Sequence, residues 1–397
     1  MKKWAGRFLL LAVLLGAVYS LAIQKLPGMV ESSLNTTHAP RPYYVSQAAQ
    51  QLHNSLLVAD MHSDSLLWSR DLLQASDIGH VDIPRLLAGN VGMQAFTIVT
   101  KSPRGQNIDN NPADTDRITD LVIASGWPLR TWNSLYERAL YQIEALHAFE
   151  AASAGRLRII KSAEDLELFL KEHRPGEPRV AGWLGIEGAH PLEGDLQNLD
   201  RLFDAGLRMA GITHFFDNEL GGSMHGIDKG GLSEFGKQAV ARMQEKGILV
   251  DLAHASSAVI EDVLAMSKAP LVVSHTGVKG TCDNNRNLSD EQIKAIAKTG
   301  GLIAVGFWDT AICGQSADDI ARAVRYIAKL VGAQHVALGS DFDGSVTTPF
   351  DVSGMAKITE ALLQAGFSRY EIRLITGLNV VRVLRKTLPA AAEAQAG

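Results

Sequence analysis

The sequence has little cysteine and no excess of positive charge, and both shortages limit what the protein can do. Its 397 residues include two cysteines, Cys282 and Cys313, and neither has a CxxC neighbour, so we do not expect a zinc site built from cysteine. The formal net charge of −5 argues against a nucleic-acid partner, which would favour a basic face. The sequence also lacks repeats and low-complexity runs, and its 46% hydrophobic residues are typical of a globular protein.

The two cysteines are expected to be separate packed thiols. A disulfide between them stays open if this part of the chain is exported, because the sequence does not show whether the two lie close together.

The amino terminus has the pattern of an export segment. Lys2, Lys3 and Arg7 precede a mainly apolar stretch at 8–23, slightly short for a membrane-spanning helix of roughly 20 residues. A cut after Ala22 fits a signal peptide, and an uncleaved membrane anchor is the alternative; in both cases we expect a periplasmic or extracytoplasmic protein. The expected divisions are this segment (1–23), a polar linker (24–42), the folded domain (43–388) and a disordered tail (389–397).

From residue 43 onward, short apolar runs alternate with longer amphipathic segments. Eight runs are predicted to be strands: Leu56–Met61, Gly92–Val99, Val180–Ile186, Leu207–Thr213, Gly247–Leu252, Pro270–Ser274, Leu302–Phe307 and His335–Gly339. Strands that alternate with helices form a parallel sheet, and eight such units favour a closed (β/α)8 TIM-type barrel. Two loops, 100–117 and 215–232, follow strands on the side where barrel active sites lie, so each either shapes a substrate pocket or is a surface insertion.

Six of the eight predicted strands end in a residue that can bind metal. These residues are His62 with Asp64, Glu187, His214, His254, His275, and Asp341 with Asp343. The carboxyl ends of parallel strands share one face of a barrel, so we expect these side chains to converge there. Imidazole and carboxylate together suit Zn²⁺ or a similar divalent ion, and several carboxylates allow two ions bridged by one of them.

Arg286 lies in a polar loop that follows His275 on the same face. Its guanidinium either binds a substrate carboxylate in bidentate fashion or bonds only the local backbone. The remaining histidines are expected at the surface (His38, His53, His80, His147 and His173), in a structural role (His335), or in loops near the site (His190 and His225).

Several motifs along the chain carry a family resemblance. They include His-Ser-Asp at 62–64, Gly-Ile-Glu-Gly-Ala-His at 185–190, Val-Asp-Leu-Ala-His-Ala-Ser at 250–256, Pro-Leu-Val-Val-Ser-His-Thr at 270–276, Asn-Arg-Asn-Leu-Ser-Asp at 285–290 and Gly-Ser-Asp-Phe-Asp-Gly at 339–344. In this order, and over about residues 50–385, they resemble the membrane dipeptidase family (renal-dipeptidase-like, peptidase family M19).

The resemblance implies a barrel with two zinc ions that hydrolyses dipeptides through an activated hydroxide; dipeptides with a C-terminal D-residue stay open as substrates. His62, Asp64, Glu187 and Asp341 would bind one zinc, and Glu187, His254 and His275 the other, with Glu187 as the bridge. Asp341 would act on the water and the leaving amine, His214 would stabilise the oxyanion, and Arg286 would hold the substrate's carboxylate.

Two other functions stay open at this point. One is a different amidohydrolase-type barrel, which would typically begin with His-x-His and use a carboxylated lysine as the bridge, where this chain has His62-Ser63-Asp64 and Glu187. The other is an exported metal-binding protein without turnover. The expected partner is a small dipeptide, membrane contact is expected only through the N-terminal segment, and a homodimer stays open.

Overall fold

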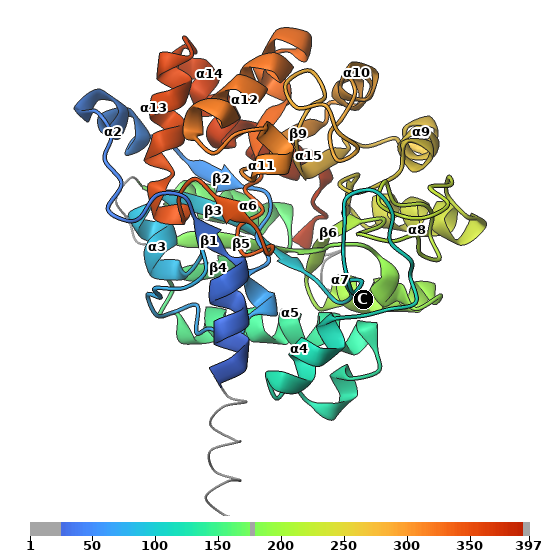
Figure 1. The fold of residues 1–397 in the computed structure, drawn as a ribbon. Helices are drawn as coiled ribbons and strands as arrows, with labels where there is room; N and C mark the ends of the chain where they lie inside the picture. Colours follow the sequence, from blue (N-terminus) through green and yellow to red (C-terminus); the bar gives the residue numbers. More distant parts are fainter. Residues whose placement is uncertain (1–24, 175–178, 392–397) are drawn as a thin grey trace, which may run out of the picture.

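Parallel strands close into a barrel with helices around it (Figure 1). The computed structural model describes residues 25–174 and 179–391. The eight barrel strands are β2 (Val58–Asp60), β3 (Val91–Ile98), β5 (Val180–Ile186), β6 (Leu207–Gly211), β7 (Leu249–Asp251), β8 (Val272–Thr276), β9 (Leu302–Val305) and β10 (Val336–Leu338). Each overlaps one predicted run, which confirms the predicted (β/α)8 barrel.

The strand order is β10-β9-β8-β7-β6-β5-β3-β2, and all hydrogen-bonded neighbours run parallel. The ring closes between β2 and β10, where the Met61 N–H donates to the Leu338 carbonyl at 2.9 Å. A further short strand, β4 (Leu157–Ile159), pairs with the beginning of β5. All carboxyl ends of the barrel strands therefore lie at one end, as the sequence argument for the ligands requires.

Helices surround the barrel. They are α2 (Gln47–His53), α3 (Ile83–Ala88), α4 (Ile118–Ala124), α5 (Leu135–Ala152), α6 (Ala163–Glu172), α7 (Leu196–Asp204), α8 (Glu234–Glu245), α9 (Ser257–Met266), α10 (Asp290–Lys298), α11 (Asp309–Ile312), α12 (Ala317–Val331), α13 (Ala356–Gln364), α14 (Arg369–Arg373) and α15 (Asn379–Thr387). Several begin at a serine whose hydroxyl accepts a hydrogen bond from a backbone N–H in the first turn of the helix. Ser289 does this for α10 and Ser316 for α12. In α12, Ile320, Val324 and Ile327 are buried, so a helical period turns one face toward the barrel.

The core has two layers because successive strand residues point to opposite faces. On β5, Trp183 packs with Met93 and Met209 in one buried cluster, whereas its neighbour Leu184 belongs to a second cluster shared with the surrounding helices. The first cluster also contains Leu384 of α15. Both faces of each strand are thus covered, which explains why the strands read as nearly continuous apolar runs.

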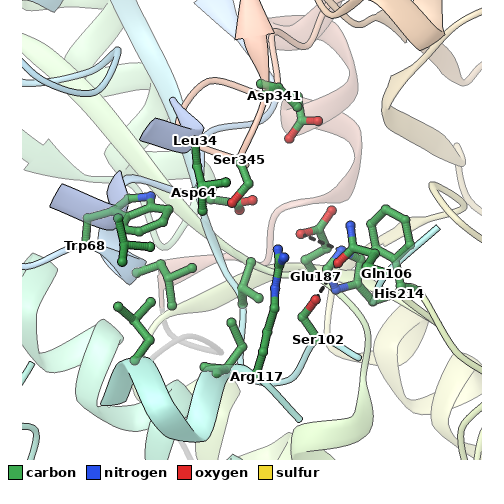
Figure 2. A pocket seen from close by; sticks show the side chains of 18 of the residues that line it. Leu34, Asp64, Trp68, Ser102, Gln106, Arg117, Glu187, His214, Asp341 and Ser345 are labelled. Atoms are coloured by element: carbon green, nitrogen blue, oxygen red, sulfur yellow. Dashed lines mark hydrogen bonds and ion pairs between the residues drawn. The ribbon is translucent and has the colours of Figure 1, made fainter. Parts of the chain in front are cut away.

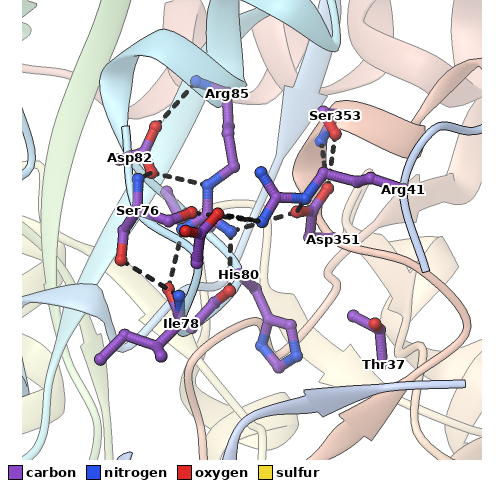
Figure 3. A network of polar contacts seen from close by, with 12 residues as sticks. Thr37, Arg41, Ser76, Ile78, His80, Asp82, Arg85, Asp351 and Ser353 are labelled. Atoms are coloured by element: carbon purple, nitrogen blue, oxygen red, sulfur yellow. Dashed lines mark hydrogen bonds and ion pairs between the residues drawn. The ribbon is translucent and has the colours of Figure 1, made fainter. Parts of the chain in front are cut away.

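The polar linker predicted at 24–42 differs from the structure, because its described part is folded. Residues 25–34 form a helix, called here the N-terminal helix, and β1 (Thr36–Thr37) pairs in parallel with β11 (Thr347–Thr348). Arg41 then pairs with Asp351 at 3.2 Å, and Asp351 also pairs with Arg85 of α3 at 3.1 Å (Figure 3). The helix was missed because Pro27 and several polar residues interrupt its apolar face, so the sequence shows no clear hydrophobic period there.

The predicted export segment at 1–23 lies outside the described residues, as do residues 392–397 of the predicted tail. The first residues of that tail are ordered, since the Pro389 carbonyl accepts a hydrogen bond from the Ala163 N–H at 2.9 Å. Within 25–174 and 179–391, no helix is both long enough and apolar enough to cross a bilayer.

Candidate metal centre and active site

The predicted ligands converge at the carboxyl end of the barrel. His62 and Asp64 follow β2, Glu187 follows β5, His254 follows β7, His275 lies in β8, and Asp341 follows β10; His214 follows β6. All are buried. Figure 2 shows the side chains of Asp64, Glu187, His214 and Asp341 around one cavity.

The carboxylate of Glu187 is the centre of this cluster. Its Oε1 lies 3.3 Å from Nε2 of His62, 3.0 Å from Nε2 of His254 and 3.3 Å from Nε2 of His275. Its Oε2 lies 3.2 Å from Nε2 of His214. One carboxylate therefore faces four imidazole nitrogens at the carboxyl end of the barrel.

A second pair of carboxylates completes the site on the side of β2 and β10. Nε2 of His62 lies 3.5 Å from Oδ1 of Asp64 and 4.0 Å from Oδ1 of Asp341. Three overlapping groups each have ligand atoms within 4.8 Å of one another: His62 with Glu187 and His275, Glu187 with His214 and His254, and His62 with Asp64 and Asp341. The barrel thus gathers both predicted halves of the centre around Glu187.

Hydroxyl groups behind the ligands fix their orientation. The Ser274 hydroxyl lies 3.0 Å from Nδ1 of His62 and 3.0 Å from Nδ1 of His275, so it directs both Nε2 atoms toward Glu187. The Thr97 hydroxyl donates to Oδ1 of Asp64 at 2.6 Å. Such partners tune the ligands of metal sites. Sequence reasoning did not find them, although Ser274 directly precedes His275.

The electrostatics of the polypeptide alone favour a bound cation. Burial and the nearby Asp64 carboxylate together raise the pKa of Glu187 to about 7, against the opposing effect of His62. Burial also raises the pKa of Asp341 well above its usual range and lowers the pKa of His254 and His275 well below theirs. Although burial opposes the shift, the nearby carboxylates of Glu187 and Asp64 raise the pKa of His62 well above its usual range, so the carboxylate cluster favours a positive charge at this place. This donor set fits divalent metal ions.

Two ligands stand in an unusual backbone conformation. The φ angle is +63° at both His254 and Asp341, in the left-handed region that non-glycine residues rarely adopt. Such strain concentrates at functional sites, where the surrounding structure holds it. The turns at the ends of β7 and β10 therefore point the side chains of His254 and Asp341 into the site, and the strained backbone makes this placement energetically costly.

Arg286 lies beside the ligands, where the sequence placed it. Its Nη2 donates to the His275 carbonyl at 2.9 Å, its Nη1 has no hydrogen-bond partner, and its guanidinium lies 5.2 Å from the ring centre of Trp308. Burial lowers the pKa of Arg286 to about 10, so the side chain remains charged at neutral pH. The Nη1 donors are therefore free for a ligand in the cavity.

The prediction of two separate thiols was wrong. Cys282 and Cys313 form a disulfide, with their Cα atoms 5.3 Å apart. The bond joins the loop that carries Arg286 to the residue after α11. The two cysteines are separated by 31 residues, and only the fold brings them together.

The site opens into a cavity of about 440 Å³. Residues of both predicted loops line it, including Ser102, Gln106 and Arg117 from the first and Phe215 from the second, so the first loop shapes the pocket rather than being a mere insertion. The two loops also touch, since the Asn111 N–H donates to the His225 carbonyl at 2.7 Å.

Four histidines outside the metal-site cluster are also buried. His225 stacks on Phe215 with ring centres 4.6 Å apart, and His190 packs against Phe216 at 5.1 Å, so both belong to the wall behind His214. The surface positions predicted for His53 and His80 are wrong, because both are buried and bonded to distant segments. Burial of this kind depends on partners that are remote in the sequence.

Comparisons with known proteins agree with this site. A family model, membrane dipeptidase (Peptidase family M19), matches residues 46–396. "Dipeptidase aclJ" of Aspergillus oryzae is 29% identical over 356 residues, covering 84% of this chain and 79% of that protein. The probable dipeptidase PvdM from Pseudomonas aeruginosa has a TM-score of 0.73 at 22% identity, covering 86% of this chain and 98% of that chain. A metallo peptidase from Rhodobacter sphaeroides, liganded with a phosphinate mimic of the dipeptide L-Ala-D-Ala, has a TM-score of 0.67 at 23% identity, covering 84% and 99%.

The family match extends over most of the folded domain, and the solved structures share its fold. This match decides between the dipeptidase and the other functions that the residues left open. The chain belongs to the membrane dipeptidase family, peptidase family M19, and is a metallo-dipeptidase that acts on small peptides.

Proposed function

We propose that the protein is an exported zinc dipeptidase with two ions bridged by Glu187. The observation that carries this proposal is the convergence of four imidazoles on one carboxylate, at 3.0–3.3 Å. His62, Asp64 and Asp341 would complete the ligands of one ion, and His254 and His275 those of the other. Imidazole and carboxylate ligands of this kind suit Zn²⁺.

The residues around the ions would carry the rest of the reaction. Bound divalent ions supply Lewis-acid chemistry, lowering the pKa of water and polarising a peptide carbonyl. Asp341 would accept the proton of the attacking water and pass it to the departing amine. His214 would donate a hydrogen bond to the oxygen on which negative charge develops.

Arg286 would select substrates by their carboxylate. Its unpartnered Nη1 and its charge fit a bidentate interaction with the carboxyl end of a dipeptide. The related metallo peptidase from Rhodobacter sphaeroides is liganded with a mimic of L-Ala-D-Ala. We therefore propose that this chain also accepts dipeptides with a C-terminal D-residue.

Export is supported by two features of the chain. Lysines and an arginine precede the apolar stretch at 8–23, and a disulfide joins Cys282 to Cys313. Disulfides persist in oxidising compartments such as the bacterial periplasm. Fractionation of cells that express the full chain, followed by N-terminal sequencing, tests this proposal and distinguishes a cleaved signal from an anchor. Recovery of the protein in the cytosol would contradict it.

The catalytic proposal is tested with zinc-loaded protein and a panel of dipeptides, half of them with a C-terminal D-residue. We expect release of free amino acids. In Glu187→Gln we expect activity to disappear and the metal content to fall, because the bridge is lost, while the circular dichroism spectrum is unchanged. Intact dipeptides throughout the panel, or full activity in the variant, would refute the proposal.

A further inference from the structure

The active-site cavity continues away from the ligands into an apolar channel. One wall of the channel is the N-terminal helix, through Leu26, Val30 and Leu34. Helix α4 also lines it, through Ile118 and Leu121. Leu67 and Trp68, a few residues after Asp64 in the sequence, complete the lining and belong to the same apolar cluster as Val30, Leu34 and Leu121. In Figure 2, Leu34 and Trp68 lie on the other side of the cavity from Glu187 and His214.

The N-terminal helix is an addition to the family domain. The family match begins at residue 46, whereas this helix occupies 25–34. It nevertheless contributes to the same cavity as Asp64, Glu187 and Arg286. A segment outside the shared domain therefore shapes the substrate pocket of this chain.

Buried polar contacts fix the helix in this position. Glu31 pairs with Arg70, and Arg70 pairs with Asp343 at 2.6 Å, two residues beyond Asp341. The side chain of Asn35 accepts a hydrogen bond from the Ser345 N–H at 2.8 Å. The helix is thus bonded to the loop that carries a ligand, so its apolar residues hold a fixed distance from the reacting centre.

The position of Arg286 determines which part of a substrate would reach the channel. Arg286 contacts the His275 carbonyl and lies near His254, on the β7–β8 side of the centre. The channel begins at Asp64 and Asp341, on the β2–β10 side. A dipeptide with its carboxylate on Arg286 therefore extends its amino-terminal residue toward the channel.

We propose that this channel binds the side chain of the amino-terminal residue and gives the enzyme a preference for dipeptides that begin with a large apolar residue. The proposal rests on the dipeptidase function proposed above. The cavity volume of about 440 Å³ falls within the range of small-molecule pockets, roughly 300–1,000 Å³. Burial of a Phe or Leu side chain favours binding by roughly 10- to 150-fold over glycine.

The test compares Phe-Ala, Leu-Ala, Gly-Ala and Glu-Ala as substrates of the zinc-loaded full chain. We expect kcat/KM for Phe-Ala and Leu-Ala to exceed that for Gly-Ala by at least about tenfold. Inhibition constants of phosphinate dipeptide mimics with a benzyl or a methyl group at the amino-terminal position should differ by a similar factor, which measures binding without turnover.

Two substitutions fill the channel from two different helices. Val30→Trp and Leu121→Trp should each reduce the Phe-Ala to Gly-Ala ratio of kcat/KM by at least about tenfold. Met29→Trp is the matched control, because Met29 lies on the same helix, is 65% exposed and does not line the cavity; its ratio should stay at the value of the unaltered protein. If the melting temperature shows that Val30→Trp is unfolded, Leu121→Trp decides.

The outcomes separate this inference from the proposed function. Equal hydrolysis of Gly-Ala and Phe-Ala would overturn the channel as an apolar subsite. So would a preference for Glu-Ala, which Arg117 in the cavity would favour. In both cases the proposed dipeptidase function would stand. A protein that hydrolyses none of the dipeptides would overturn both.

Discussion

Loss of the disulfide should destabilise the fold without disabling the site. We consider the double variant Cys282→Ser/Cys313→Ser. The bond closes a separation of 31 residues, for which loop-closure entropy predicts a stabilisation of about 3.7 kcal/mol. Unfolding of a barrel of this size carries an entropy of about 0.7 kcal/mol per kelvin, so the melting temperature should fall by roughly 5 °C.

The site should survive because other contacts hold the same loop. The side-chain amide of Asn287 donates to the Cys282 carbonyl at 2.7 Å and to the Ala311 carbonyl at 3.1 Å. The first bond closes the Arg286 loop on itself, and the second links this loop to α11 without the disulfide. We therefore expect kcat and KM of the double variant at 25 °C to match those of the unaltered protein.

The assay is thermal unfolding by circular dichroism, with and without reductant, together with thiol titration under denaturing conditions. Reductant should lower the melting temperature of the unaltered protein and leave that of the double variant unchanged, which controls for other effects of the reductant. Two titratable thiols in the oxidised protein, or equal melting temperatures for both proteins, would refute the reasoning.

Three further predictions concern the binding of substrate, metal and the N-terminal helix. Arg286→Leu should raise KM by a factor equivalent to about 2–5 kcal/mol and abolish discrimination against dipeptide amides, measured by steady-state kinetics; unchanged discrimination would contradict the carboxylate role. Ser274→Ala frees Nδ1 of His62 and His275, so zinc affinity should fall about 10- to 100-fold in a chelator competition. Burial raises the pKa of Glu31 from 4.5 to about 7, although pairing with Arg70 opposes this shift. Protonated Glu31 therefore contributes about 3 kcal/mol to the free energy of unfolding. This contribution is fully present below pH 4.5 and is lost as the pH rises through about 7. Glu31→Gln should remove this part of the pH dependence of unfolding, and an identical pH profile in the variant would contradict it.

The barrel was predictable because its strands are buried on both faces. Such strands appear as short continuous apolar runs, and β5 and β9 begin and end within a few residues of their predicted positions. The ligands were predictable for a related reason. A charged residue directly after a buried run, such as Glu187 after β5, must lie at the carboxyl end of a strand, and a barrel brings all these ends together.

Contacts between remote segments carry no such local signal. The disulfide joins two loops whose distance depends on how the last strands and helices pack, and nothing around Cys282 or Cys313 indicates it. His80 is buried because the Thr36 carbonyl, far away in the sequence, lies 2.9 Å from its Nε2. The hydrophobic period identifies strands and long helices, but it does not predict which distant segment packs against a given loop.

The N-terminal helix also depends on remote contacts, and its position bears on substrate specificity. Its residues resemble a linker, since Pro27 and several polar residues interrupt a single apolar face, and no catalytic group lies on it. Only the fold shows that Glu31 is bonded through Arg70 to Asp343 and that Val30 faces the cavity. The candidate ligands lie at strand ends, where sequence patterns reveal them. The channel proposed to select the substrate is lined by the N-terminal helix and α4, which lie outside the family motifs, so those motifs identify the reaction but not the preferred dipeptide.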